Sequence, residues 1–166
     1  DGMNQAAYAA GQPIPNIIGM AFSYSMTIAV LYPAFALAVL IFSKSNQLKT
    51  VGKISIAPAF FGISEPLMFG VPVVMNPFMA IPWIISPTVN VLLGWLACSS
   101  GLVARYAGVT VFNFPMGVTG ILNGSFTIAI LEVVVCIIDV LIFMPFVRIQ
   151  DKKYIDAEKA AETEQN

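Results

Sequence analysis

The chain has 166 residues, of which 58% are hydrophobic and only 10% are charged, and its formal net charge is −1. About a quarter of the residues of an ordinary soluble domain are charged, so this composition excludes a domain whose whole surface faces water. The absence of histidine also excludes an imidazole base or metal ligand from this chain. We therefore expect an all-α integral membrane protein, with the lipid bilayer as its surroundings.

The first part of the chain predicts a loop, a spanning helix and a basic loop. Residues 1–16 are polar and rich in Ala, Gly and Pro, which indicates an extracellular loop. The 26 residues from 17 to 42 carry no charge, enough to span about 30 Å of hydrocarbon, and Pro33 within them predicts a kink. Residues 43–53 carry three lysines, so the positive-inside rule makes this loop cytoplasmic.

Residues 57–87 are apolar but contain six prolines. Each interior proline costs an α-helix about 3 kcal/mol and one hydrogen bond, and broken backbone survives at membrane depth only when protein buries it or water reaches it. We therefore predict a re-entrant helical hairpin, with turns at 70–72 and 76–77. The alternative is one strongly kinked spanning helix.

The remainder predicts two further spans and a second broken segment. Residues 88–104 and 126–146 are apolar and long enough to cross the bilayer, whereas 109–125 contain Pro115 and three glycines and indicate a second, shorter re-entrant piece. The charged residues 148–166 predict a cytoplasmic tail, either a frayed helix or disordered.

The transport domain would thus occupy residues 17–147, with three spanning helices and two re-entrant helical hairpins. Because the basic loop and the tail lie on one side, each hairpin must return to the side that it left. The two hairpins then open from opposite sides and meet near the midplane, as the substrate sites of transporters do.

Carboxylates inside apolar segments need a reason, because an acidic side chain at a helix centre costs about 2.5–3.5 kcal/mol. Glu65 precedes Pro66, which favours an extended backbone, and its carboxylate is suited to accept hydrogen bonds from the hydroxyls of a sugar. It could also cap the helix that follows, and the two roles are compatible. Glu132 and Asp139, two turns apart, could line a water path, face a partner helix or pair with Arg105.

Other candidate ligand groups are few. Asn76 and Asn113 lie in the two broken segments, where each could bind a ligand or satisfy freed backbone groups. Cys98 and Cys136 lie in apolar runs and are expected to be small buried side chains. There is no Ser-His-Asp arrangement, CxxC pair or phosphate-binding GxxxxGK[ST] loop, so we expect no catalytic residue, cofactor site or metal site.

Four runs resemble the permease subunit, enzyme IIC, of bacterial phosphotransferase systems of the lactose/cellobiose/diacetylchitobiose type. They are SKSNQLK (43–49), FGISEPLMFGVPVVMNP (61–77), IP (81–82) and SPTVN (86–90). The resemblance is densest over 43–94, and the chain would correspond to the C-terminal portion of such a permease.

The resemblance implies a multi-pass protein of the bacterial cell membrane that binds a disaccharide or β-glucoside and carries it inward. A cytoplasmic phosphorylated IIB subunit would then phosphorylate the sugar. Glu65 would hold the hydroxyl that accepts the phosphoryl group, with Ile63 and Ser64 beside it. Phe112, where the family usually has a tryptophan that stacks on the sugar, and Asn113 would close the site from the second hairpin.

The resemblance also implies a homodimer, and the chain could instead complement an N-terminal permease half; we expect no nucleic-acid partner. Two other functions stay open from the residues alone. One is an ion-coupled secondary transporter that uses Glu65, Glu132 or Asp139 as a proton carrier. The other is a truncated membrane subunit that does not transport.

Overall fold

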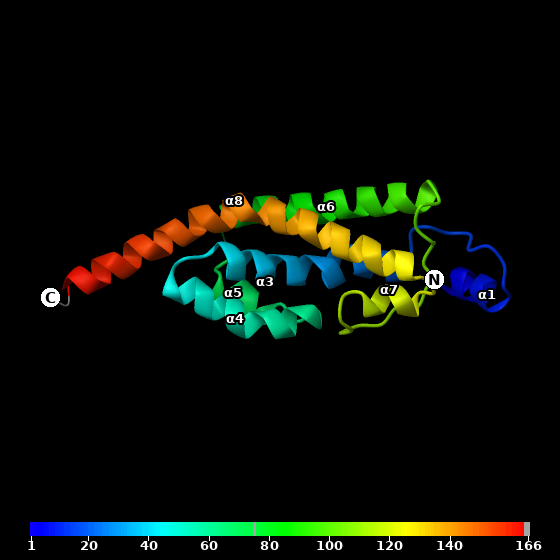
Figure 1. The fold of residues 1–166 in the computed structure, drawn as a ribbon, viewed down its shortest axis with the longest axis horizontal. Helices are drawn as coiled ribbons and strands as arrows, with labels where there is room; N and C mark the ends of the chain where they lie inside the picture. The colour runs from blue at the N-terminus through cyan, green and yellow to red at the C-terminus, as the bar shows by residue number, and fades with distance from the viewer. Residues whose placement is uncertain (75, 165–166) are drawn as a thin grey trace.

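The computed structural model describes residues 1–74 and 76–164, and every regular element within them is a helix. Three helices are long and apolar enough to cross a membrane: Met20–Phe42, Pro77–Ser99 and Phe126–Thr163. They run side by side along the long axis of the molecule (Figure 1). The predicted all-α membrane fold with three spanning helices is confirmed.

The first span combines α2 (Met20–Tyr24), a π-helical turn η1 (Ser25–Ala29) and α3 (Val30–Phe42). Pro33 has no N–H to donate to the carbonyl of Ala29, where the π-helical turn ends, so the distortion that this proline predicts appears as a widened turn. The widened turn is held from outside, because Asn90 Nδ2 donates to the Met26 carbonyl at 3.0 Å.

Helix α4 (Asn46–Phe60) occupies most of the segment predicted to be a loop over 43–53. Ser45 caps it by accepting from Leu48 N–H, and Gly52 lets it pack closely on α3, since a Cβ there would lie 3.1 Å from the Leu40 backbone. Lys49 and Lys53 are therefore carried on a helix, which the positive-inside argument alone did not predict, whereas Lys44 lies in the link before it.

The C-terminal tail is not a separate frayed segment. Helix α8 (Phe126–Glu164) extends beyond the predicted end of the span at 146 and includes the tail residues that the structure describes. Asp151 accepts from Lys44 N–H, Ser45 N–H and the Ser45 hydroxyl at 2.7–2.9 Å, and Glu158 accepts from two further N–H groups at the start of α4. Carboxylates at a helix N-terminus are favoured, so α4 and the tail stabilise each other.

Replacing Asp151 by alanine is expected to lower the free energy of unfolding by about 1–3 kcal/mol, because two N–H groups and one hydroxyl lose a charged acceptor. Thermal unfolding in detergent, followed by circular dichroism, measures this loss. Asp156→Ala is the matched control, since Asp156 is exposed on the same helix. Equal melting temperatures for the two variants would contradict the capping role.

The first hairpin is formed by α4 and α5 (Glu65–Gly70), rather than by residues 57–87. The second spanning helix, α6 (Pro77–Ser99), begins within the predicted hairpin and ends before 104. Three of the six prolines occupy places that tolerate them, since Pro66 and Pro77 start helices and Pro72 lies in a link, and Pro58 lies in the last turn of α4. Only Pro82 and Pro87 lie deep inside a helix, and a spanning helix accommodates them.

The second hairpin enters from the opposite end of the bundle (Figure 1). An irregular segment from 100 to 117 leads to α7 (Val118–Leu122). The side chain of Asn123 forms hydrogen bonds with backbone groups of this irregular segment. Asn123 accepts from Gly108 N–H and Val109 N–H and donates to the carbonyls of Val109 and Thr119. Non-helical backbone is thus covered by protein groups, as membrane depth requires.

Residues 1–16, predicted to be a loop, contain a short helix, α1 (Gly2–Ala9). It docks on the irregular segment: Asn4, which is buried, donates to the Tyr106 carbonyl at 3.0 Å, and Gln5 donates to the Gly108 carbonyl at 2.6 Å. These tertiary contacts explain a helix that the local sequence does not predict.

Gly120 sets the distance between α7 and α8. A Cβ at this position would lie 2.5 Å from Ala129 N and 2.9 Å from Ala129 Cα, which are backbone atoms that cannot turn aside. We expect Gly120→Ala to destabilise the fold by about 1–3 kcal/mol. The melting temperature in detergent measures the effect, with Gly2→Ala, where a Cβ meets nothing within 4 Å, as control. Unchanged stability would show that the two helices are free to separate.

Candidate functional site

The tips of the two hairpins face each other midway along the bundle (Figure 1). Tyr24, a buried side chain of the first span, connects them: its hydroxyl accepts from Asn113 N–H at 3.0 Å, and a Cβ on Gly62 would lie 2.9 Å from the same oxygen. That Cβ would also lie 3.7 Å from Asn113 Oδ1. The predicted meeting of two opposed hairpins is therefore present, and we call these residues the hairpin junction.

Ile63, Ser64 and Glu65 directly follow Gly62 at the tip of the first hairpin. Gly62 turns the chain with φ of 76°, a left-handed conformation that favours glycine, and α5 then starts at Glu65 with Pro66 in its first turn. The side chains of Ile63 and Glu65 are exposed, and Ser64 is half-buried. Glu65 thus lies in the first turn of a helix, as the capping alternative requires, and is also accessible to a ligand.

The second hairpin brings Phe112 and Asn113. The Phe112 ring packs edge-to-face on Tyr24 at 5.1 Å between centroids, yet 61% of the residue stays exposed. Asn113 has φ of 59°, a strained value for a residue other than glycine, and its backbone is held by Tyr24. An aromatic ring that stays largely exposed can still offer a face to a sugar.

Asn76 does not join the hairpin junction. Its side chain caps α6 by accepting from Phe78 N–H and Met79 N–H, and it donates to Gln150 Oε1 at 3.3 Å. Of its two predicted roles, Asn76 therefore has that of binding free backbone groups, and it lies beside the C-terminal half of α8.

Glu132 is fully buried and ties three elements together. Its carboxylate accepts from the Ser25 hydroxyl at 2.5 Å, the Thr119 hydroxyl at 2.7 Å and Gly117 N–H at 2.6 Å. Of the alternatives for this residue, the structure therefore favours a contact with partner elements. Arg105 is not its partner, because the guanidinium donates to the carbonyls of Ile14 and Pro15.

Asp139 is also fully buried and lies against α6. It accepts from Asn90 Nδ2 at 2.7 Å, and the same amide group donates to the Met26 carbonyl in the π-helical turn. Asp139 therefore links α6, α8 and the first span, away from the hairpin junction. Among the residues that the structure describes, no group of three or more His, Cys, Asp or Glu side chains is arranged to hold a metal ion.

Two residues of the junction were not predicted from sequence. Tyr24 sits in an uncharged span, where an aromatic residue gives no sign of binding a distant backbone N–H. Gly62 precedes the Ile-Ser-Glu-Pro run, and a glycine beside a proline-rich stretch does indicate a turn. The tertiary contact, rather than any local pattern, identifies both.

The comparison with protein families matches residues 2–87 to the model "Phosphotransferase system, EIIC". The oligo-beta-mannoside-specific EIIC component of Bacillus subtilis is 37% identical over 162 residues, covering 94% of this chain and 37% of that protein. The lactose-specific EIICB component of Lacticaseibacillus casei is 33% identical over 169 residues, covering 96% of this chain and 28% of that protein.

Among solved structures, the chain is similar to the transporter ChbC, the IIC component from the N,N'-diacetylchitobiose-specific phosphotransferase system. The TM-score is 0.88 at 36% sequence identity, over 95% of this chain and 38% of that one. The chain thus spans a little over a third of the length of ChbC and of the Bacillus subtilis relative.

Proposed function

Because the chain belongs to the EIIC family of the phosphotransferase system, whose model matches residues 2–87, we propose that it is the sugar-holding part of a permease of the bacterial cell membrane. Its substrate would be a disaccharide or β-glucoside. The names of its relatives support this class, since they specify oligo-β-mannosides, lactose and diacetylchitobiose.

The hairpin junction is the observation that carries the proposal. Two hairpins from opposite ends of the bundle meet there, at one buried tyrosine, and present an acid and an aromatic ring that are both exposed. A carboxylate that accepts hydroxyl protons and a ring that packs on the apolar face of a pyranose are complementary to a sugar. In this proposal Glu65 orients the reacting hydroxyl, and Phe112 and Asn113 close the site.

Phosphoryl transfer would belong to a cytoplasmic IIB partner, so the chain itself would supply binding and orientation. Relatives named EIICB support this partner, because that name joins a IIB to a IIC component. We further propose that the chain works in a larger assembly, either a homodimer or a complex with an N-terminal permease half.

Uptake into proteoliposomes tests the proposed function. Vesicles that hold the chain and its assembly partners are given labelled cellobiose or lactose, with phosphorylated IIB or with a proton gradient alone. We expect labelled sugar phosphate to accumulate only with IIB. Accumulation of unmodified sugar that requires the proton gradient would instead identify an ion-coupled transporter, and absence of both would indicate a subunit that does not transport.

A further inference from the structure

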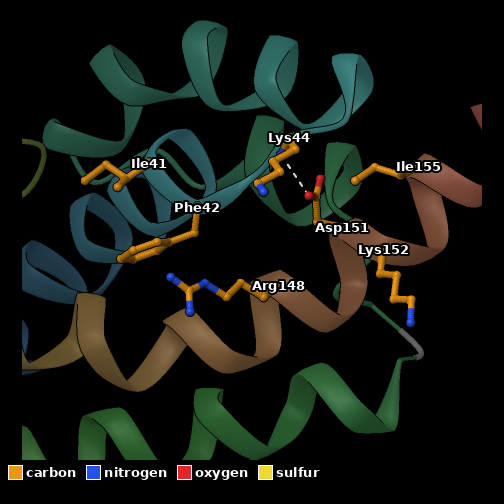
Figure 2. Close-up of a pocket in the computed structure, with 7 residues that line it drawn as sticks. All are labelled: Ile41, Phe42, Lys44, Arg148, Asp151, Lys152 and Ile155. Carbon is orange, nitrogen blue, oxygen red and sulfur yellow. Dashed lines mark hydrogen bonds between the residues drawn. The ribbon is translucent and has the colours of Figure 1, made fainter.

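A concave site lies at the C-terminal end of the first span. A cavity of about 460 Å³ opens where α3 ends and faces the later part of α8. Figure 2 shows its walls: Phe42 and Lys44 come from the end of α3 and the link that follows, and Arg148 and Asp151 come from α8. None of these residues belongs to the hairpin junction.

The cavity is positively charged. Lys44, Arg148 and Lys152 line it against one acid, Asp151. That acid is buried, and its oxygens already accept from Lys44 N–H, Ser45 N–H and the Ser45 hydroxyl. The Asp151 carboxylate is therefore already bound to groups at the start of α4. The remaining lining of the cavity is positively charged and suits an anion.

The cationic groups are held beside an apolar wall. The Arg148 guanidinium lies 5.2 Å from the centroid of the Phe42 ring, a cation–π contact that fixes the orientation of the arginine. Ile41, 59% exposed, continues the wall along the span. Lys152 extends away from Arg148 (Figure 2), so Lys44 and Arg148 are the two cations nearest the apolar wall.

The height of the cavity along the bundle indicates its surroundings. Phe42 is the last residue of the first span, and Arg148 is the first charged residue after the apolar part of α8. Side chains at this level lie among lipid headgroups, and basic pockets between membrane helices bind anionic headgroups. A free phosphate ion has no apolar group to pack on the apolar wall. A phospholipid has a phosphate for the basic side chains and acyl chains for the apolar wall.

We propose that this cavity binds an anionic phospholipid, with Lys44 and Arg148 on its phosphate and an acyl chain against Phe42 and Ile41. Each basic group near the surface contributes about fivefold to the affinity for anionic lipid. Loss of both is therefore expected to weaken binding about 25-fold. The inference stands on the geometry of this cavity and does not depend on the proposed sugar site.

The experiment uses the purified chain in neutral detergent, titrated with phosphatidylglycerol or with phosphatidylcholine of the same acyl chains. Bound lipid is counted by native mass spectrometry, and the melting temperature is followed in parallel. We expect phosphatidylglycerol to bind and raise the melting temperature, and the double variant Lys44→Gln/Arg148→Gln to need about 25-fold more lipid. Arg148→Lys keeps the positive charge, so this variant should lose less lipid affinity than the double variant.

The matched control is Lys49→Gln/Lys153→Gln, because these two exposed lysines lie at the same end of the molecule but outside the cavity lining. Equal losses in the two double variants would overturn the site in favour of general surface charge. Equal binding of phosphatidylcholine would overturn the requirement for an anion. An equal rise in melting temperature with inorganic phosphate alone would overturn the lipid and leave a simple anion site.

Discussion

Replacing Glu65 by glutamine is expected to reduce IIB-dependent phosphorylation of the sugar about 10- to 100-fold. The substitution keeps the size of the side chain but removes its charge, and a hydrogen bond to a charged group contributes about 1.5–3 kcal/mol. A glutamine also presents an amide group that donates rather than accepts on one side. The rate of labelled sugar-phosphate formation in membranes measures the effect.

Glu158→Gln is the matched control for Glu65→Gln. Glu158 accepts from Asn46 N–H and Gln47 N–H at the start of α4, a role that the glutamine oxygen can retain. We therefore expect near-normal phosphorylation in this variant. Normal phosphorylation in Glu65→Gln as well would remove Glu65 from the site and leave it as a helix-capping residue.

Replacing Glu132 by alanine is expected to destabilise the fold by about 3–5 kcal/mol, the largest stability effect that we predict. Ser25, Thr119 and Gly117 would each lose an acceptor inside the protein, and a buried donor without a partner costs about 1–3 kcal/mol. Gly117 and Thr119 belong to the second hairpin, so the loss of their hydrogen bonds to Glu132 would also release this hairpin from the first span.

Chemical denaturation in detergent, followed by circular dichroism, measures the stability of the Glu132 variants. Glu132→Gln retains one acceptor oxygen and should lie between the wild type and Glu132→Ala. Restoration of stability in proportion to the retained hydrogen bonds supports the linking role. A Glu132→Ala protein as stable as the wild type would contradict it, and would reopen the possibility of a water path beside this residue.

Much of the architecture follows from the sequence because the bilayer constrains it strongly. An apolar run long enough to cross the bilayer must be a helix, so the three spans could be predicted. Because the basic loop and the tail lie on the same side of the membrane, an even number of crossings separates them. Each broken segment must therefore return to the side that it left, and the two hairpins open from opposite sides. The meeting of the two hairpin tips follows from that topology, although the contacts of Gly62 and Asn113 with Tyr24 do not.

The boundaries could not be predicted from the same patterns. Prolines mark helix starts as well as breaks, so Pro77 opened α6 where a turn was expected. Helices α1 and α4 and the extension of α8 depend on distant partners, such as Asn4 with the Tyr106 carbonyl and Asp151 with Ser45. Such tertiary contacts leave no periodic signal in the local sequence.

The central claim is that the hairpin junction holds a sugar. Equilibrium binding of labelled cellobiose or lactose to the purified chain, compared among Glu65→Gln, Phe112→Ala and Asn76→Ala, tests it most directly. We predict saturable binding to the wild type, loss of about tenfold or more in affinity for the first two variants, and retention in Asn76→Ala, because Asn76 caps α6 away from the junction. Equal affinity in Glu65→Gln, Phe112→Ala and the wild type would contradict the claim.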